Sequence, residues 1–117
     1  MNTTILYYAK CSTCQKALRW VEEHQLSCSL RPIKEENPGF EELKDWVQRS
    51  GLPMKRFFNT SGLRYKELGL KDKLPTMSEE EQLRLLASDG MLVKRPLLVS
   101  DTLVLPGFKE AEWEILL

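Results

Sequence analysis

Two cysteines near the N-terminus, in the sequence Cys11-Ser12-Thr13-Cys14, have the spacing of a thiol redox pair. The residues before them are β-branched and aromatic and those after them are helix-forming, so the pair falls where a strand passes into a helix. Backbone N–H groups and the helix dipole at that end stabilise an anion. We therefore expect Cys11 to be a nucleophile of lowered pKa, and Cys14, one turn later, to resolve a mixed disulfide.

A zinc site is the alternative use of a C-x-x-C motif. Zinc would need two more ligands, and only Cys28 and His24 remain, neither of them in a second paired motif. The position between strand and helix favours thiol chemistry and no bound metal. We expect Cys28 to be a small buried hydrophobic residue on a strand, and His24 to interact with the C-terminal end of the helix.

Lys94-Arg95-Pro96-Leu97 is a second segment with chemical potential. Pro96 enters a strand that faces the first strand, where a cis peptide bond in a tight turn can occur. Arg95 would place its guanidinium over the thiolate or a bound oxyanion, in bidentate fashion. The alternative is a solvated arginine beside an edge strand, because most arginines are exposed.

The expected anion site needs further donors around the nucleophile. Lys10 would add a positive charge next to it, and the backbone N–H groups of Thr13 and Cys14 would receive the negative charge. Together with Ser12 and Pro96, these residues complete the predicted binding site for a substrate or anion.

Hydrophobic patterning predicts the strands that position these residues. Strands are expected over 3–8, 28–33, 97–100 and 103–105. Pro32 cannot donate a ladder hydrogen bond, so the second strand should lie at an edge. The first two strands should be parallel because a helix joins them, and Asp101-Thr102 between the last two indicates a hairpin.

Helices are expected over residues 12–24, at several places within about 38–90, and over 109–116. The long middle segment therefore forms a helical insertion, in which Gly51 ends one helix and Ser78 with Glu81 begins another through a capping box. In the last helix, Phe108, Ala111 and Ile115 are expected to share one face.

Composition excludes several classes of protein. The 117 residues suit one domain, and 17 basic residues balance 17 acidic ones, which argues against a dedicated binder of nucleic acid or membrane surfaces. No apolar run approaches the roughly 18 residues of a membrane span, and residues 1–9 do not have the pattern of a signal peptide. Three cysteines are too few and too odd a number for a secreted disulfide framework, so we expect a reducing cytoplasm.

Over essentially its whole length the chain resembles the arsenate reductase/Spx family. The matching segments are Cys11–Ala17, Phe57–Gly62, Tyr65–Leu70 and Lys94–Leu97. The resemblance implies a single α/β domain over 1–117 with a thioredoxin-like (glutaredoxin-type) fold, in which the helical insertion separates strands 2 and 3 of a mixed four-stranded sheet. It also implies that Cys11 is the catalytic cysteine and that Arg95 binds the oxyanion and the substituted cysteine.

The chain departs from the family's arsenate reductases at several positions. The resemblance implies two further arginines in those enzymes. They would fall within residues 58–60 and near residues 104–106, and this chain has no arginine at either place. Their histidine before the cysteine falls near Tyr7, and Cys14 stands where many have another residue. Losing two charge-assisted contacts would weaken arsenate binding by roughly two to four powers of ten.

Two functions of different classes follow from the resemblance. One is a thiol–disulfide oxidoreductase without a bound cofactor, which reduces a disulfide, a glutathionylated thiol or arsenate and takes electrons from glutathione with glutaredoxin or from thioredoxin. The other is an Spx-like redox-sensing regulator that binds the RNA polymerase α subunit. Spx proteins usually continue as a charged tail, whereas this sequence stops at Leu117, which favours the first hypothesis. A protein that keeps the fold without either activity is a third hypothesis.

Overall fold

A four-stranded mixed sheet forms the centre of the computed structural model, which describes residues 2–117. The strand order is β2–β1–β3–β4, with β1 (Thr4–Tyr7), β2 (Ser29–Pro32), β3 (Leu97–Val99) and β4 (Val104–Pro106). β1 is parallel to β2 and antiparallel to β3, and β3 and β4 form an antiparallel hairpin. The predicted α/β fold, the parallel first pair, the edge position of β2 and the hairpin are confirmed.

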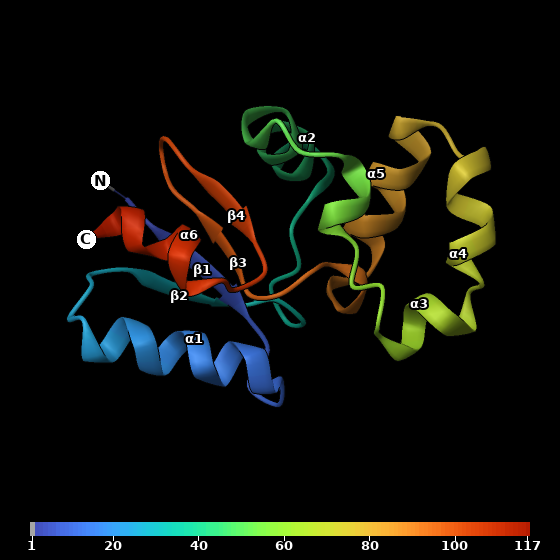
Figure 1. The fold of residues 1–117 in the computed structure, drawn as a ribbon. Coiled ribbons are helices and arrows are strands. Elements are labelled where there is room, and N and C mark those ends of the chain that lie inside the picture. Colours follow the sequence, from blue (N-terminus) through green and yellow to red (C-terminus); the bar gives the residue numbers. More distant parts are fainter. Residues whose placement is uncertain (1) are drawn as a thin grey trace.

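Six α-helices surround this sheet within the described residues. They are α1 (Ser12–Glu23), α2 (Phe40–Ser50), α3 (Leu63–Glu67), α4 (Leu70–Lys73), α5 (Glu79–Ser88) and α6 (Glu110–Trp113), with 3-10 turns at Met54–Phe57, Leu74–Thr76, Gly90–Leu92 and Glu114–Leu116. α1 and α2 lie on opposite sides of the sheet (Figure 1). α3, α4 and α5 extend from one end of the sheet, so the molecule is elongated, with a long axis of 42 Å.

Two helix boundaries in the insertion follow from local chemistry. α2 ends at Gly51, whose φ of 68° is the left-handed conformation that favours glycine. α5 begins with the predicted capping box: the Ser78 hydroxyl accepts the Glu81 N–H at 3.1 Å, and the Glu81 carboxylate accepts the Ser78 N–H at 2.8 Å. Both predicted boundaries are confirmed.

The strands present alternate side chains to two cores, as their two-residue period requires. Ile5 and Leu98 face α1 and α6, where they pack in a cluster with Ala17, Trp20, Val21 and Trp113. Leu6 and Leu97 belong to the other, larger cluster, which α2 and the insertion complete. The sheet is therefore covered on both faces, and α1 is fixed to it by the smaller core.

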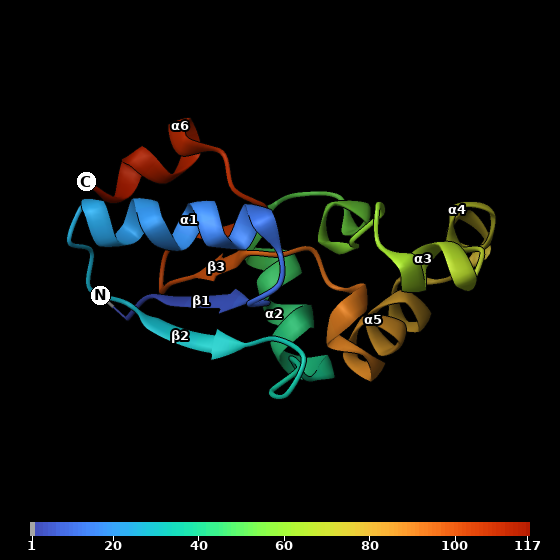
Figure 2. The same ribbon diagram turned by 90° about the horizontal axis from the view of Figure 1, so that it is seen from below.

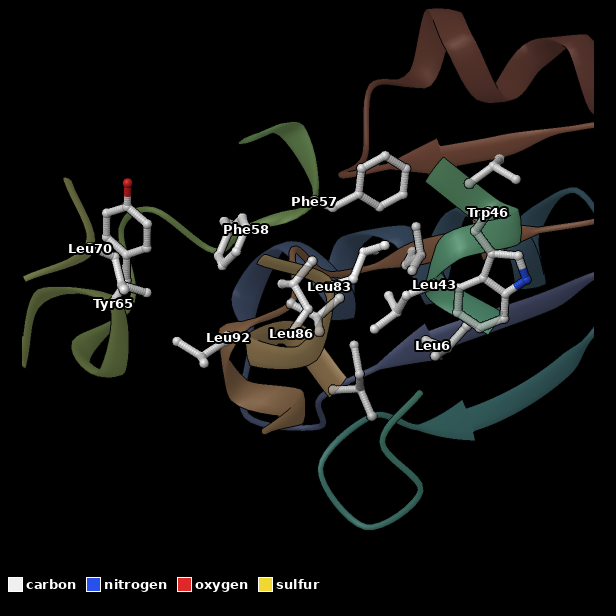
Figure 3. Close-up of a cluster of buried hydrophobic side chains, with 14 of the residues drawn as sticks. Leu6, Leu43, Trp46, Phe57, Phe58, Tyr65, Leu70, Leu83, Leu86 and Leu92 are labelled. Carbon is white, nitrogen blue, oxygen red and sulfur yellow. The ribbon is translucent and has the colours of Figure 1, made fainter. Parts of the chain in front are cut away.

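The larger core runs without interruption from the sheet into the helical insertion (Figure 3). Its labelled side chains pass from Leu6 to Leu43 and Trp46 of α2 and on to Tyr65 and Leu70 at the far end. The insertion and the sheet therefore share one core. Because this core is shared, the insertion holds the residues before β3 in a fixed position.

Two sequence-based expectations in this part of the molecule are wrong. The last helix does not bury Phe108, Ala111 and Ile115 on one face: Ala111 is exposed and Ile115 is 70% exposed, whereas Trp113 is 0% exposed. Within α6 the buried side chain is Trp113, and the 3-10 turn that follows it changes the face that Ile115 presents. Cys28 precedes β2 instead of lying in it, and it is only half-buried.

Candidate active site at the start of helix α1

Cys11 occupies the N-cap of α1, at the end of the sheet from which the insertion extends (Figure 2). Its backbone is extended, with φ −88° and ψ 122°, and its Sγ accepts the backbone N–H of Cys14 at 3.4 Å. The N–H of Cys11 donates to the carbonyl of Tyr8 at 3.0 Å, which closes the turn between β1 and the helix. The sulfur is thus held at the helix N-terminus while Cys11 stays half-buried.

Cys14 lies directly beneath this turn and is 0% exposed. The N–H of Tyr8 donates to its sulfur at 3.5 Å. All three cysteines are free thiols in this structure. The two sulfurs of the motif therefore differ in access: a molecule in solution meets Cys11, and Cys14 lies behind it.

The environment moves the pKa values of these two thiols in opposite directions. Burial raises the pKa of Cys11, but the N–H and thiol of Cys14, the charge of Arg95 and the N–H of Thr13 outweigh it, so the pKa is lowered overall. For Cys14, burial and the neighbouring Cys11 sulfur raise the pKa to about 12, against smaller opposing effects from the Tyr8 N–H and Arg95. Cys11 therefore ionises first.

Arg95 approaches the site from the segment that leads into β3. Its peptide bond to Pro96 is cis. The Arg95 guanidinium carbon lies 5.0 Å from the centre of the Tyr8 ring, and Nη1 donates to the Met91 carbonyl at 3.2 Å. Its Nε is buried and has no hydrogen-bond partner within residues 2–117. The arginine is therefore half-buried against the site, not solvated beside an edge strand.

The other predicted site residues are spread more widely. Ser12 and Thr13 are exposed in the first turn of α1, and Pro96 is buried, with its carbonyl accepting the Gly107 N–H at 2.8 Å. Lys10 is exposed and lines a hollow with Tyr7, Tyr8, Ala9, Pro32, Lys34 and Glu35. The Arg95 guanidinium is a positive charge that lowers the pKa of Cys11.

Tyr8 is the site residue that sequence reasoning missed. Its backbone forms hydrogen bonds with both cysteines of the motif, and its ring makes a cation–π contact with the Arg95 guanidinium. Its position at the end of a strand, just before the cysteines, was the available signal. Its ring's partner comes from the opposite end of the sequence, so only the fold reveals the contact.

His24 lies at the other end of α1, at the C-cap. One ring nitrogen, Nδ1, is 2.8 Å from the Trp20 carbonyl, and the ring contacts that of Trp20 with the centroids 4.3 Å apart and the planes tilted by 38°. The predicted interaction with the helix C-terminus is confirmed. Within residues 2–117 no group of three or more His, Cys, Asp and Glu side chains could hold a metal ion. None of the helices in that range is long and apolar enough to cross a membrane.

The fold and the site define the class of this protein: a thioredoxin-like α/β domain with a thiol pair at the start of its first helix. Residues 6–116 match the ArsC family, and the chain belongs to that family. The relationship predicted from the cysteine motif and the Arg-Pro segment is thus confirmed.

The relatives of this chain include an uncharacterized protein and transcriptional or regulatory proteins. The chain is 54% identical to the uncharacterized protein YusI of Bacillus subtilis, over 97% of each chain. It is 28% identical to the regulatory protein MgsR of the same organism, over 93% of this chain and 85% of MgsR. Identity to the global transcriptional regulator Spx of Enterococcus faecalis is 26%, over 93% of this chain and 81% of Spx.

Solved structures agree with the fold. A protein related to the ArsC family from Bacteroides fragilis is 57% identical and superposes with a TM-score of 0.97, covering 100% of this chain and 98% of its own. A possible arsenate reductase from Streptococcus mutans is 42% identical, with a TM-score of 0.89 and coverage of 97% and 96%.

Proposed function

We propose that this chain is a thiol–disulfide oxidoreductase in which Cys11 is the nucleophile and Cys14 the resolving thiol. One observation carries the proposal: the sulfur of the half-buried Cys11 stands at the N-cap of α1 and accepts the Cys14 N–H, while Cys14 lies buried behind it. This arrangement lowers the pKa of Cys11 and raises that of Cys14 to about 12. A thiolate is the reactive form of cysteine. The first attack therefore begins at Cys11, and Cys14 waits as a protonated thiol.

The proposed reaction has two exchange steps. The Cys11 thiolate attacks one sulfur of a substrate disulfide, the S–S bond breaks, and one substrate thiolate leaves while the other half stays bound to Cys11. Cys14 then attacks the Cys11 sulfur, the bond from Cys11 to the substrate breaks, and the Cys14 proton passes to the departing sulfur, which leaves as the second substrate thiol. Two electrons pass from the cysteine pair to the substrate, and the pair is left as a Cys11–Cys14 disulfide.

Regeneration requires an external thiol reductant. Glutathione with glutaredoxin, or thioredoxin, is the proposed donor, and either places the reaction in a reducing cytoplasm. Two electrons return to the Cys11–Cys14 disulfide and two protons restore the thiols. No bound cofactor takes part in this scheme.

Arg95 and the first turn of α1 stabilise charge at the reacting sulfur in this scheme. The N–H groups of Thr13 and Cys14 and the Arg95 guanidinium already favour the thiolate. The Arg95 guanidinium, which is only half-buried, can also donate to an anionic group on the substrate that reaches Cys11. The same donors would hold the negative charge of a leaving thiolate.

Arsenate is the less favoured substrate. The positions where the resemblance expects two further arginines include apolar residues that contribute to the core: Phe58 is 1% exposed and Val104 is 4% exposed. A doubly charged tetrahedral anion would then meet one arginine and the helix N-terminus. A disulfide or a glutathionylated thiol needs no such set of donors.

The test is turnover of hydroxyethyl disulfide and, separately, of arsenate by the purified protein. One arm receives glutathione with glutaredoxin and the other receives thioredoxin with its reductase. After subtraction of the turnover that glutaredoxin or thioredoxin gives without this chain, we expect disulfide reduction that is lost in both Cys11→Ser and Cys14→Ser and retained in the matched variant Cys28→Ser. A fully active Cys11→Ser protein would disprove the proposal. Arsenate turnover dependent on Cys11 would instead extend the function to arsenate.

A redox-sensing regulator is the second candidate, favoured by the resemblance to MgsR and Spx over more than nine-tenths of this chain. There the Cys11–Cys14 pair would act as a switch without turnover, and the RNA polymerase α subunit would be the partner. The experiment is a pull-down with the C-terminal domain of the α subunit, under oxidising and reducing conditions. Binding in one redox state alone would support this candidate, and no binding in either state would count against it.

A further inference from the structure

Charge is unevenly distributed along this electrically neutral chain. Residues 1–21, 46–66 and 90–100 contain ten of the 17 basic residues and none of the 17 acidic ones. The first of these segments carries Cys11 and the third carries Arg95. The chain is therefore balanced overall, while the segments around the thiol site are positively charged.

Backbone hydrogen bonds join the second segment (46–66) to the third segment (90–100), which carries Arg95 of the thiol site. The N–H of Lys94 donates to the Phe57 carbonyl at 2.8 Å, and the N–H of Asn59 donates to the Leu92 carbonyl at 2.8 Å. Between them, Phe58 and Val93 form an antiparallel bridge. This short pairing brings the cations of the 3-10 turn Met54–Phe57 next to those that precede β3.

A hollow of about 300 Å³ lies at this junction. Three of its six lining residues are cations; the lining consists of Pro53, Lys55, Arg56, Phe58, Thr60 and Lys94. None of the ion pairs formed within residues 2–117 involves Lys55, Arg56 or Lys94. The hollow thus contains three positive charges without a carboxylate partner, and the Thr60 hydroxyl adds a neutral donor.

The side chain of Lys94 lies against Gly107, the residue that follows β4. A Cβ placed on Gly107 would lie 3.3 Å from the Lys94 Cε, and Gly107 has a φ of 83° that other residues rarely adopt. Lys94 is half-buried as a result. Its neighbour in sequence, Arg95, acts on Cys11.

We propose that this basic hollow binds a carboxylate of the small disulfide whose sulfur reacts with Cys11; the inference rests on the proposed function and adds the class of its substrate. A hollow of about 300 Å³ is at the lower end of the range for small-molecule sites, roughly 300–1,000 Å³, and it is open to solvent. A peptide-like disulfide can place a carboxylate among Lys55, Arg56 and Lys94 while its sulfur meets Cys11 beside Arg95. The carboxylate is only bound: the electrons and protons move as in the two exchange steps above.

The experiment compares glutathione disulfide with the same molecule esterified at its glycyl carboxylates. The rate of mixed-disulfide formation at Cys11 is measured by mass spectrometry in the Cys14→Ser background, with hydroxyethyl disulfide as a neutral reference. We expect the free acid to react roughly tenfold faster than the ester at low salt, and this ratio to fall as ionic strength rises. Equal rates for acid and ester would overturn the inference while leaving the proposed function intact.

Variants then locate the effect. Lys94→Gln and Arg56→Gln should each lower the acid-to-ester ratio severalfold and leave the rate with hydroxyethyl disulfide unchanged. Lys73→Gln removes the same charge from an exposed site at the end of α4 and is the matched control. An equal loss in Lys73→Gln would mean a general charge effect, which contradicts a specific site.

A binding measurement separates this inference from the chemistry. Glutathione disulfide added to the Cys11→Ser protein should shift the backbone amide NMR signals of residues 55–60 and 94, and the ester should not. Because Cys11→Ser cannot form the mixed disulfide, this measurement does not depend on whether the unaltered chain reduces disulfides. Absence of shifts with the acid would overturn the inference on its own, and reaction of the ester alone at Cys11 would point to an uncharged substrate.

Discussion

Cys11 and Cys28 lie near the two ends of the same helix and are both half-buried, yet their thiols have opposite properties. Cys11 stands at the N-terminus of α1, where N–H groups and Arg95 lower its pKa. Cys28 follows the C-terminal end of α1, in a hollow of about 150 Å³ whose lining is mostly apolar and includes Ile5, Val21, Leu26 and Leu98. Burial raises the pKa of the Cys28 thiol, and no hydrogen bond or charge from residues 2–117 offsets it.

The opposite pKa shifts of Cys11 and Cys28 show that solvent exposure alone does not determine the reactivity of a cysteine. Both thiols can be reached from solvent to a similar degree, but only Cys11 has donors aimed at its sulfur. The N-terminal end of a helix supplies such donors and the C-terminal end does not. The chemistry of this chain therefore depends on which end of α1 a cysteine occupies.

The largest expected effect is a difference in alkylation rate between these two cysteines. Because the thiolate is the reacting form, iodoacetamide at pH 7 should modify Cys11 at least about 100-fold faster than Cys28. Peptide mapping by mass spectrometry over a time course measures both rates in one sample, and guanidinium-unfolded protein is the control. Similar rates for Cys11 and Cys28 in the folded protein would contradict the comparison.

The second prediction concerns the resolution of the mixed disulfide formed by the first attack. In Cys14→Ser, a mixed disulfide on Cys11 has no resolving thiol and should accumulate to about one per chain, whereas the unaltered chain should proceed to the internal disulfide. Intact-protein mass spectrometry after addition of glutathione disulfide gives the result. Cys28→Ser, the matched variant, should behave as the unaltered chain does. Persistent mixed disulfide in that variant would mean that Cys28, and not Cys14, resolves the intermediate.

Much of the difference between the two thiols could be predicted from the sequence, because its basis is local. The spacing of Cys11 and Cys14, placed between a β-branched strand and a helical pattern, is sufficient to put one thiol at a helix N-cap. Pro32 correctly indicates an edge strand for the same local reason, its missing N–H. The arginine next to a proline is recognisable as a candidate from the segment itself.

The features that could not be predicted depend on contacts between distant segments. The ring of Tyr8 under Arg95, and the hollow in which Lys94 meets the turn that contains Lys55, bring together residues that no periodicity connects. The hydrophobic pattern starts the second strand at Cys28, whereas β2 begins one residue later, at Ser29. A hydrophobic pattern does not fix the first and last residues of an element. Ile115 does not lie on the predicted buried face of the last helix, because the α-helix changes to a 3-10 turn before it.

The third prediction tests the contribution of Arg95 to the difference between the thiols. Arg95→Gln removes a charge that favours the Cys11 thiolate, so the pKa of Cys11 should rise and its alkylation at pH 7 should slow by roughly three- to tenfold. Arg95→Lys, which keeps the charge, should lose less. Rates measured from pH 5 to 10 should converge at the alkaline end, where the thiolate is fully formed in each protein. An unchanged midpoint for Cys11 in Arg95→Gln would show that the N–H groups alone set its pKa.

The smallest expected effect is on stability, and its sign should differ between the two cysteines. The folded pKa of Cys11 lies below the unfolded value of about 8.5, so its ionisation stabilises the fold above that pH, and this stabilisation is lost as pH falls through the folded pKa. For Cys28 the folded pKa lies above the unfolded value. Its contribution is complete below about pH 8.5 and is lost as pH rises toward the folded pKa.

Urea denaturation between pH 5 and 10 measures both effects as differences from serine variants. The free energy of unfolding of the unaltered chain minus that of Cys11→Ser should increase with pH up to about 8.5. The same difference for Cys28→Ser should stay level to about that pH and then decrease. Cys14 is present in the unaltered chain and in both variants, so the loss of stability that its raised pKa causes above about pH 8.5 is shared by all three proteins and largely cancels in each difference. Slopes of the same sign would mean that the two ends of α1 treat a thiolate alike, which would remove the physical basis for assigning the chemistry to Cys11.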